Sequence, residues 1–172
     1  MTKNSCVIAF SSNGSRLFGT IFSKNVMEGT TSAVIKKDGM DATARICSVI
    51  LESDFYDKMS TVLLDRVIFG DSNVADIKAI RKNTGLDVIL VSQKKPNIKA
   101  LMSLLRKHEN YKERLQALSN AGNIYTYGPI FYQKEGLGIK ECETAISALC
   151  INSNIPEPLR VADVVASGLG NI

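Results

Sequence analysis

The sequence predicts an α/β fold with a mixed sheet, and three observations carry this prediction. Residues 6–36 alternate apolar runs with short turns, which is the pattern of an antiparallel meander. From residue 42 the apolar period changes to that of a helix, and helical and strand-like segments then alternate. Two later runs, 61–64 and 87–92, are short and almost wholly apolar, as strands buried inside a sheet are. An antiparallel start that continues into alternating helices and strands is typical of a mixed α/β sheet.

The first three strands are expected over residues 6–10, 16–23 and 30–36. The turn between the first two contains Asn13-Gly14, and Asn-Gly is the strongest short hairpin signal. Three consecutive strands joined by short turns form a meander, so an antiparallel unit is expected to open the fold.

Helices are expected where apolar residues recur every three or four positions. Ala42, Ile46 and Ile50 fall on one face of a helix over residues 42–53. A helix over 73–83 is expected to stop at Gly85, and Pro158 can open the last helix, through about residue 166, because proline is tolerated in a first turn. The other helices are expected over 99–108, 112–121 and 139–150, with a late strand over 130–133.

Composition indicates an ordinary soluble globular protein. The 172 residues are 45% hydrophobic and 22% charged, which suits one domain over residues 1–172 with a substantial core. No apolar run is long enough to span a membrane and the first residues do not resemble a signal peptide, so we expect a cytoplasmic protein without a membrane partner. Four cysteines occur in apolar stretches without a Cys-x-x-Cys pair, which favours buried thiols over zinc ligands. They are Cys6, Cys47, Cys142 and Cys150.

Positive charge is concentrated in one segment. The whole chain carries +4, but residues 94–114 alone contain seven basic and two acidic residues. Such a segment suits an anionic partner such as nucleic acid, although solvated helix faces produce similar runs. Arg160 is ambiguous, since it can bind phosphate or pair with Glu157. The residues expected to contact phosphate are Lys94, Lys95, Lys99, Arg106 and Arg160.

Acidic side chains follow two of the predicted strands, and another lies within the last predicted helix. Asp41, with Asp38 close by, follows the third strand, Asp65 follows the run 61–64, and Asp163 lies in the last helix. Carboxylates that converge at one sheet edge repel each other unless a divalent cation lies between them. The pattern therefore points to Mg²⁺ or Mn²⁺ and to phosphodiester chemistry. Each aspartate also has a structural alternative, such as a turn, a helix cap or surface charge.

The order of elements is that of the ribonuclease H-like fold, by analogy. Several motifs in sequence order also resemble the archaeal endonuclease dU family, which is itself similar to endonuclease V. They are Asp38-Gly39-Met40-Asp41-Ala42-Thr43, Val62-Leu63-Leu64-Asp65, Asn73-Val74-Ala75-Asp76-Ile77, Thr84-Gly85-Leu86-Asp87-Val88-Ile89-Leu90-Val91 and Ile155-Pro156-Glu157-Pro158-Leu159-Arg160-Val161-Ala162-Asp163.

The resemblance implies an endonuclease V-like mixed sheet with flanking helices, a divalent metal and repair of deaminated DNA, with cutting near deoxyuridine. It also implies that the metal is bound by Asp65, Asp163 and either Asp38 or Asp41. The catalytic candidates are Asp41, Asp65 and Asp163. The chain departs from the family where the first strand should end in Gly-Ile-Asp-Asp, since it has Ser11 and Ser12 there. Serine is a poorer Mg²⁺ ligand than carboxylate.

Two functions therefore stay open. One is a metal-dependent endonuclease acting on deaminated DNA, weakened by the two serines and by Arg66 beside Asp65. The other is a non-catalytic nucleic-acid-binding relative with the same fold. Four aromatic residues between 125 and 132 are either core or a stacking surface for a flipped base. They are Tyr125, Tyr127, Phe131 and Tyr132. The sequence does not determine the oligomeric state.

Overall fold

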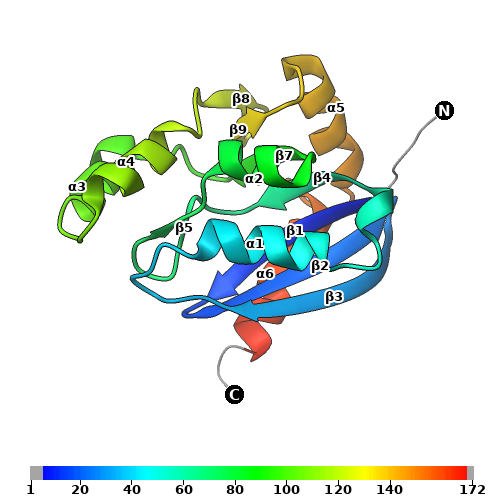
Figure 1. Ribbon diagram of the computed structural model, residues 1–172. Helices are drawn as coiled ribbons and strands as arrows, with labels where there is room; N and C mark the ends of the chain where they lie inside the picture. The colour runs from blue at the N-terminus through cyan, green and yellow to red at the C-terminus, as the bar shows by residue number, and fades with distance from the viewer. Residues whose placement is uncertain (1–5, 170–172) are drawn as a thin grey trace.

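A computed structural model describes residues 6–169 and contains a seven-stranded mixed sheet flanked by helices (Figure 1). The strand order is β3-β2-β1-β4-β7-β9-β8, and a separate two-stranded sheet joins β5 to β6. This architecture confirms the predicted α/β class. None of the helices within residues 6–169 combines the length and apolarity needed to cross a membrane.

The strands are β1 (Cys6–Asn13), β2 (Arg16–Ser23), β3 (Val26–Val34), β4 (Met59–Leu64), β5 (Ile68–Phe69), β6 (Asn73–Val74), β7 (Asp87–Ser92), β8 (Tyr125–Tyr127) and β9 (Ile130–Glu135). The helices are α1 (Ala42–Leu51), α2 (Ile77–Thr84), α3 (Ile98–Leu105), α4 (Tyr111–Ser119), α5 (Ile139–Leu149) and α6 (Glu157–Leu169), with a 3₁₀ turn η1 (Tyr56–Lys58) before β4.

The meander of β1, β2 and β3 is antiparallel, as predicted, and tight turns join its strands. Asn13 pairs with Arg16, so the first turn consists of Gly14-Ser15, and Gly14 takes a φ of 58° that glycine adopts without strain. The third strand begins at Val26 rather than at residue 30, because Lys24-Asn25 forms a two-residue turn in place of the longer loop expected.

Parallel pairing in the centre of the sheet aligns the strand ends that matter for function. β1 pairs in parallel with β4, and β4 pairs in parallel with β7. In this register Phe10 lies opposite Leu64, which lies opposite Leu90. Leu63 pairs with Ile89, so the prediction of adjacent parallel strands at these residues is confirmed.

The helix predicted over residues 73–83 is wrong at its start. Asn73 belongs to β6, and the helix begins at Ile77 after the N-cap Asp76, whose carboxylate accepts from the Ala79 N–H. Asn73 is buried, and its amide donates to Lys36 O and to the Asp41 carboxylate. These tertiary bonds outweigh the local helical pattern. The short strands β5 and β8 were also not predicted.

Two apolar cores cover the two faces of the sheet. The larger lies under α1 and α2, and the smaller lies under α5 and α6, the latter passing behind β1 and β2 in Figure 1. Cys6, Cys47 and Cys142 are buried as expected and Cys150 is partly buried. Burial raises the pKa of the Cys142 thiol to about 12, so this cysteine is protonated at neutral pH and serves packing.

Candidate functional site

The alternation of side chains along β1 and β4 places Ser11 and Asp65 on the same face of the sheet. Ala9 and Leu63 belong to the core under α5 and α6. Ser11 comes two residues after Ala9, and Asp65 two residues after Leu63. Their side chains therefore point to the same face of the sheet as this core. Both follow directly after the paired residues Phe10 and Leu64, and therefore lie side by side at the carboxyl ends of these strands.

The last helix brings Asp163 to the same place. Leu159 of α6 packs in the core with Ala9 and Leu63, and Asp163 lies one helical turn later on the same face. Two hydrogen bonds fix α6 across the meander, from Thr20 Oγ1 to Pro158 O at 2.7 Å and from Asn13 Nδ2 to Ala166 O at 3.3 Å.

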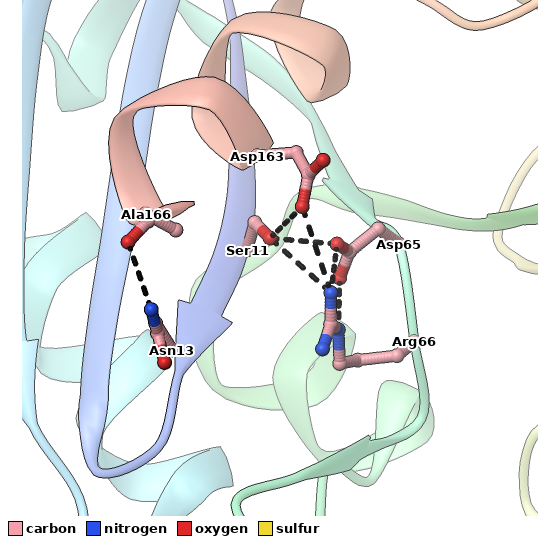
Figure 2. Close-up of polar contacts among 6 residues, drawn as sticks. All are labelled: Ser11, Asn13, Asp65, Arg66, Asp163 and Ala166. Atoms are coloured by element: carbon pink, nitrogen blue, oxygen red, sulfur yellow. Dashed lines mark hydrogen bonds and ion pairs between the residues drawn. The ribbon is translucent and has the colours of Figure 1, made fainter. Parts of the chain in front are cut away.

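Ser11, Asp65 and Asp163 form one polar cluster (Figure 2). The Ser11 hydroxyl lies 2.7 Å from Asp65 Oδ2 and 3.4 Å from Asp163 Oδ1. Ser11 is completely buried, whereas the Asp163 side chain is 60% exposed. Ser11, rather than Ser12, thus occupies the first-strand position of the expected site. Asp65 and Asp163 therefore converge on the same hydroxyl group.

Arg66 completes this cluster by a bidentate ion pair with Asp65. Its Nε and Nη2 donate to the two carboxylate oxygens at 2.8 and 2.7 Å. Nη2 also lies 3.4 Å from Ser11 Oγ and 3.9 Å from Asp163 Oδ1, so the guanidinium points into the space between the carboxylates (Figure 2). The hydrogen bonds to Asp65 raise the pKa of Arg66 above its ordinary value, with further contributions from both negative charges.

Asp38 and Asp41 make their contacts elsewhere. The Asp41 carboxylate accepts from Lys36 N at 3.1 Å and from Asn73 Nδ2 at 2.7 Å. Asp38 accepts from the Ser72 hydroxyl at 3.2 Å. Within residues 6–169 neither aspartate forms a hydrogen bond or ion pair with Ser11, Asp65 or Asp163. Asp38 and Asp41 therefore connect the loop before α1 to the β6 region. Asn73 also connects them, because its amide donates to Lys36 O and to Asp41.

The donor set does not fit a divalent cation in this arrangement. Both oxygens of Asp65 are engaged by Arg66, and the first-strand ligand is the neutral hydroxyl of Ser11. In the part of the chain that the structure describes, no three His, Cys, Asp or Glu side chains gather as metal ligands. Hard cations prefer several oxygen ligands that include carboxylates. Of the pair Asp65 and Asp163, Asp163 alone has both oxygens beyond hydrogen-bond distance of Arg66, so too few carboxylate oxygens are free to bind a cation.

Two depressions flank the cluster. A cavity of about 200 Å³ lies between Asp65 and Arg66 on one side and Phe131 and Gln133 on the other. Its wall is otherwise mainly apolar and includes Val67, Ile68, Leu90, Pro96, Leu101 and Ile124. A second groove borders Asp65 and Asp163 and carries Lys94 and Arg160 on its rim. The cluster therefore lies between an apolar cavity and a groove with basic side chains.

The expected phosphate-binding residues have different surroundings. Lys94, Lys95, Lys99 and Arg106 are exposed, as binding to phosphate requires. Arg160 pairs with Glu157 through two hydrogen bonds of 2.7 and 2.6 Å, and this contact lowers the pKa of the Glu157 carboxyl. The sequence allowed Arg160 either to bind phosphate or to pair with Glu157, and the structure shows the ion pair with Glu157.

Arg114, counted with the same basic segment, is a structural residue. It is 4% exposed and donates to the backbone carbonyls of Asp38, Gly39, Ser72 and Glu109. The sequence contained a signal for this role, because Arg114 lies four residues before the buried Leu118 on the same face of α4.

The aromatic residues divide between core and cavity. Tyr132 is buried, its hydroxyl contacts Glu143 at 3.2 Å, and Tyr125 stacks on its ring at a centroid distance of 5.3 Å. Desolvation raises the pKa of Tyr132 to about 12. Phe131, on the opposite face of β9, is partly exposed and lines the cavity beside Asp65. Among these aromatics Phe131 is the one best placed to contact a ligand there.

Comparison with known proteins identifies the family. The model of the endonuclease dU family matches residues 4–170. The chain belongs to the endonuclease dU family. A UPF0215 protein of Methanosarcina barkeri is 37% identical over 147 residues, which cover 83% of this chain and 76% of the relative.

Solved structures support the fold. A protein of unknown function from Archaeoglobus fulgidus is 30% identical and superposes with a TM-score of 0.90, covering 95% of this chain and 96% of its own. Endonuclease V of Ciona intestinalis, in complex with a 24mer DNA containing an inosine, has a TM-score of 0.63 at 13% identity and covers 99% and 87% of the two chains. The ribonuclease H-like, endonuclease V-like fold predicted from the sequence is therefore confirmed.

Proposed function

We propose that this member of the endonuclease dU family is a cytoplasmic protein that recognises deaminated bases of the deoxyuridine type in DNA and cleaves the adjacent backbone weakly. The observation that carries the proposal is the convergence of Asp65 and Asp163 on Ser11 at the carboxyl ends of central strands. Ligands of open α/β sheets bind at such ends. A phosphodiester is the substrate that membership of the endonuclease dU family implies.

The surroundings of the cluster support a DNA ligand. The cavity beside Asp65 is lined by Phe131 and apolar side chains, the kind of lining that holds a base extruded from the duplex. The groove on the other side carries Lys94 and Arg160, which suit the phosphates of the same strand. Endonuclease V of Ciona intestinalis, which shares the fold, is seen with DNA that contains inosine.

Cleavage is expected to be weak because two features depart from a metal nuclease. Ser11 supplies a hydroxyl in place of a bridging carboxylate, and Arg66 engages both oxygens of Asp65. Cleavage by the metal-dependent route that the family suggests therefore requires a rearrangement of the cluster.

A nicking assay tests this function. Duplexes with one deoxyuridine, one deoxyinosine or no lesion are incubated with the natural chain, Ser11→Asp, Ser12→Asp and Asp65→Asn, with Mg²⁺ or Mn²⁺. We expect slow lesion-dependent nicking by the natural chain, faster nicking by Ser11→Asp, and no gain in Ser12→Asp, whose side chain points to the other face of the sheet. Robust cutting of undamaged DNA, or lesion cutting that survives Asp65→Asn, would contradict the proposal.

The second candidate function is a binding protein without catalysis. The Arg66–Asp65 ion pair favours this alternative, because it neutralises the carboxylate that a nuclease needs. It predicts selective binding to deaminated duplexes with no nicking by any of the four proteins. Binding measured on the same duplexes separates the two functions.

A further inference from the structure

We propose that Arg66 is the resident cation of this site and that it excludes a divalent metal from the Asp65–Asp163 pair. Arg66 follows Asp65 directly in the sequence, so it leaves the same strand end and turns back onto the carboxylate before it. The proposal concerns the same site as the proposed function. Its test uses no DNA, so the two can fail separately.

The geometry is that of a cation bound by three oxygen groups. The guanidinium donates to both oxygens of Asp65, and Nη2 lies 3.4 Å from Ser11 Oγ and 3.9 Å from Asp163 Oδ1. A metal shared by the two carboxylates needs the same oxygen atoms and the same space. A planar guanidinium matches a carboxylate by two parallel hydrogen bonds, which makes Arg66 a specific competitor rather than a diffuse positive charge.

The surroundings explain why the side chain stays in this position. Asp65 is 18% exposed and lies beside the buried Ser11, whose hydroxyl donates to one of the same oxygens. Two carboxylates held around one hydroxyl repel each other unless positive charge lies between them. Arg66 supplies that charge from within the chain, so the pair is neutralised without an external ion.

Manganese binding tests the proposal. Free Mn²⁺ is measured by electron paramagnetic resonance, and heats of binding by calorimetry, on the full chain and its variants. The variants are Arg66→Gln, Ser11→Asp, the two combined, and Arg66→Gln with Asp65→Asn. Arg81→Gln is the matched control, because Arg81 also forms an ion pair with an aspartate, Asp87, which lies at the opposite end of β7 from the cluster.

We expect the natural chain and Arg81→Gln to bind Mn²⁺ equally weakly. Arg66→Gln should bind at least about tenfold more tightly, a factor equivalent to about 1.4 kcal/mol. Adding Ser11→Asp should tighten binding further, and adding Asp65→Asn should abolish the gain. If Arg66→Gln does not fold, Arg66→Lys replaces it, since lysine lacks the planar fork and should give part of the gain.

Three results would overturn the proposal. The first is tight Mn²⁺ binding by the natural chain that equals the binding by Arg66→Gln. The second is no gain in a folded Arg66→Gln or Arg66→Lys variant, judged by an unchanged circular dichroism spectrum. The third is a gain that survives Asp65→Asn, because the ion would then bind at another site.

Discussion

Arg114 shows how backbone carbonyls can hold a cation in a protein interior. Its guanidinium donates to carbonyl oxygens of the loop before α1, of Ser72 and of its own helix start, so one side chain joins three segments. We expect Arg114→Met to lower the free energy of unfolding by about 2–4 kcal/mol, because several buried carbonyls lose their donor. Urea denaturation measures this change.

The exposed Arg106 provides the control for Arg114. Arg106→Met removes the same charge from the same basic segment, but it should change stability by less than about 0.5 kcal/mol, as surface substitutions do. Equal effects of the two substitutions would show that charge, rather than the carbonyl contacts, makes Arg114 important.

At the residue level, the positions of the site were more predictable than its contacts. Asp65 and Ser11 were predictable because strand alternation and parallel register fix where their side chains point. The orientation of Arg66 was not, since a long side chain at the surface has many rotamers and the contact with Asp163 depends on a helix about one hundred residues away. The contact between Asp41 and Asn73 was not predictable either, since the local pattern at Asn73 favours a helix and the contact depends on β6.

At the level of elements, the N-caps of α2 and α3 offer a matched comparison. Asp76 accepts from Ala79 N, and Asn97 accepts from Ala100 N, both at 3.1 Å. Asp76 also accepts from Asn120 Nδ2 at 2.8 Å, which connects α2 to the end of α4.

We expect Asn97→Ala to destabilise the fold by about 1 kcal/mol, as loss of a cap does. Asp76→Ala should cost about 1 kcal/mol more, because a second hydrogen bond is lost with it. Thermal unfolding of both variants measures the difference. Equal losses would mean that the contact with Asn120 contributes nothing to stability.

Elements with a clear pattern of apolar residues could be predicted from the sequence, whereas the two-residue strands could not. The strands β4 and β7 are continuous apolar runs, and α1 and α5 have clear helical faces, so local pattern and tertiary structure agree there. β5 and β6 have two residues each and exist because they pair with one another. A pairing partner cannot be identified from so short a segment.

For the whole molecule, the distribution of charge predicts how DNA binding depends on salt. Lys94 and Lys95 follow β7 at the site edge of the sheet, and Lys94 lines the groove beside Asp163. We expect Lys94→Glu with Lys95→Glu to weaken DNA binding and to reduce the slope of log affinity against log salt by about 2, roughly one per lysine lost. Fluorescence anisotropy over a range of salt concentrations measures both quantities.

A control with the same change in charge lies at the opposite edge. Lys24 follows β2 beside the start of β1, and Lys58 precedes β4. Lys24→Glu with Lys58→Glu alters net charge equally but should leave the slope unchanged. An equal loss in both double variants would mean that net charge, and not this surface, controls affinity.

The position of Asp163 in α6 also has a consequence for biosynthesis. Ser11 and Asp163 are 152 residues apart in the sequence, yet they share one hydroxyl contact. During translation β1 leaves the ribosome long before α6 does, so the nascent meander exposes the apolar surface that α6 later covers. The pair of carboxylates forms only after the last helix has left the ribosome, so any shorter nascent chain lacks the assembled cluster.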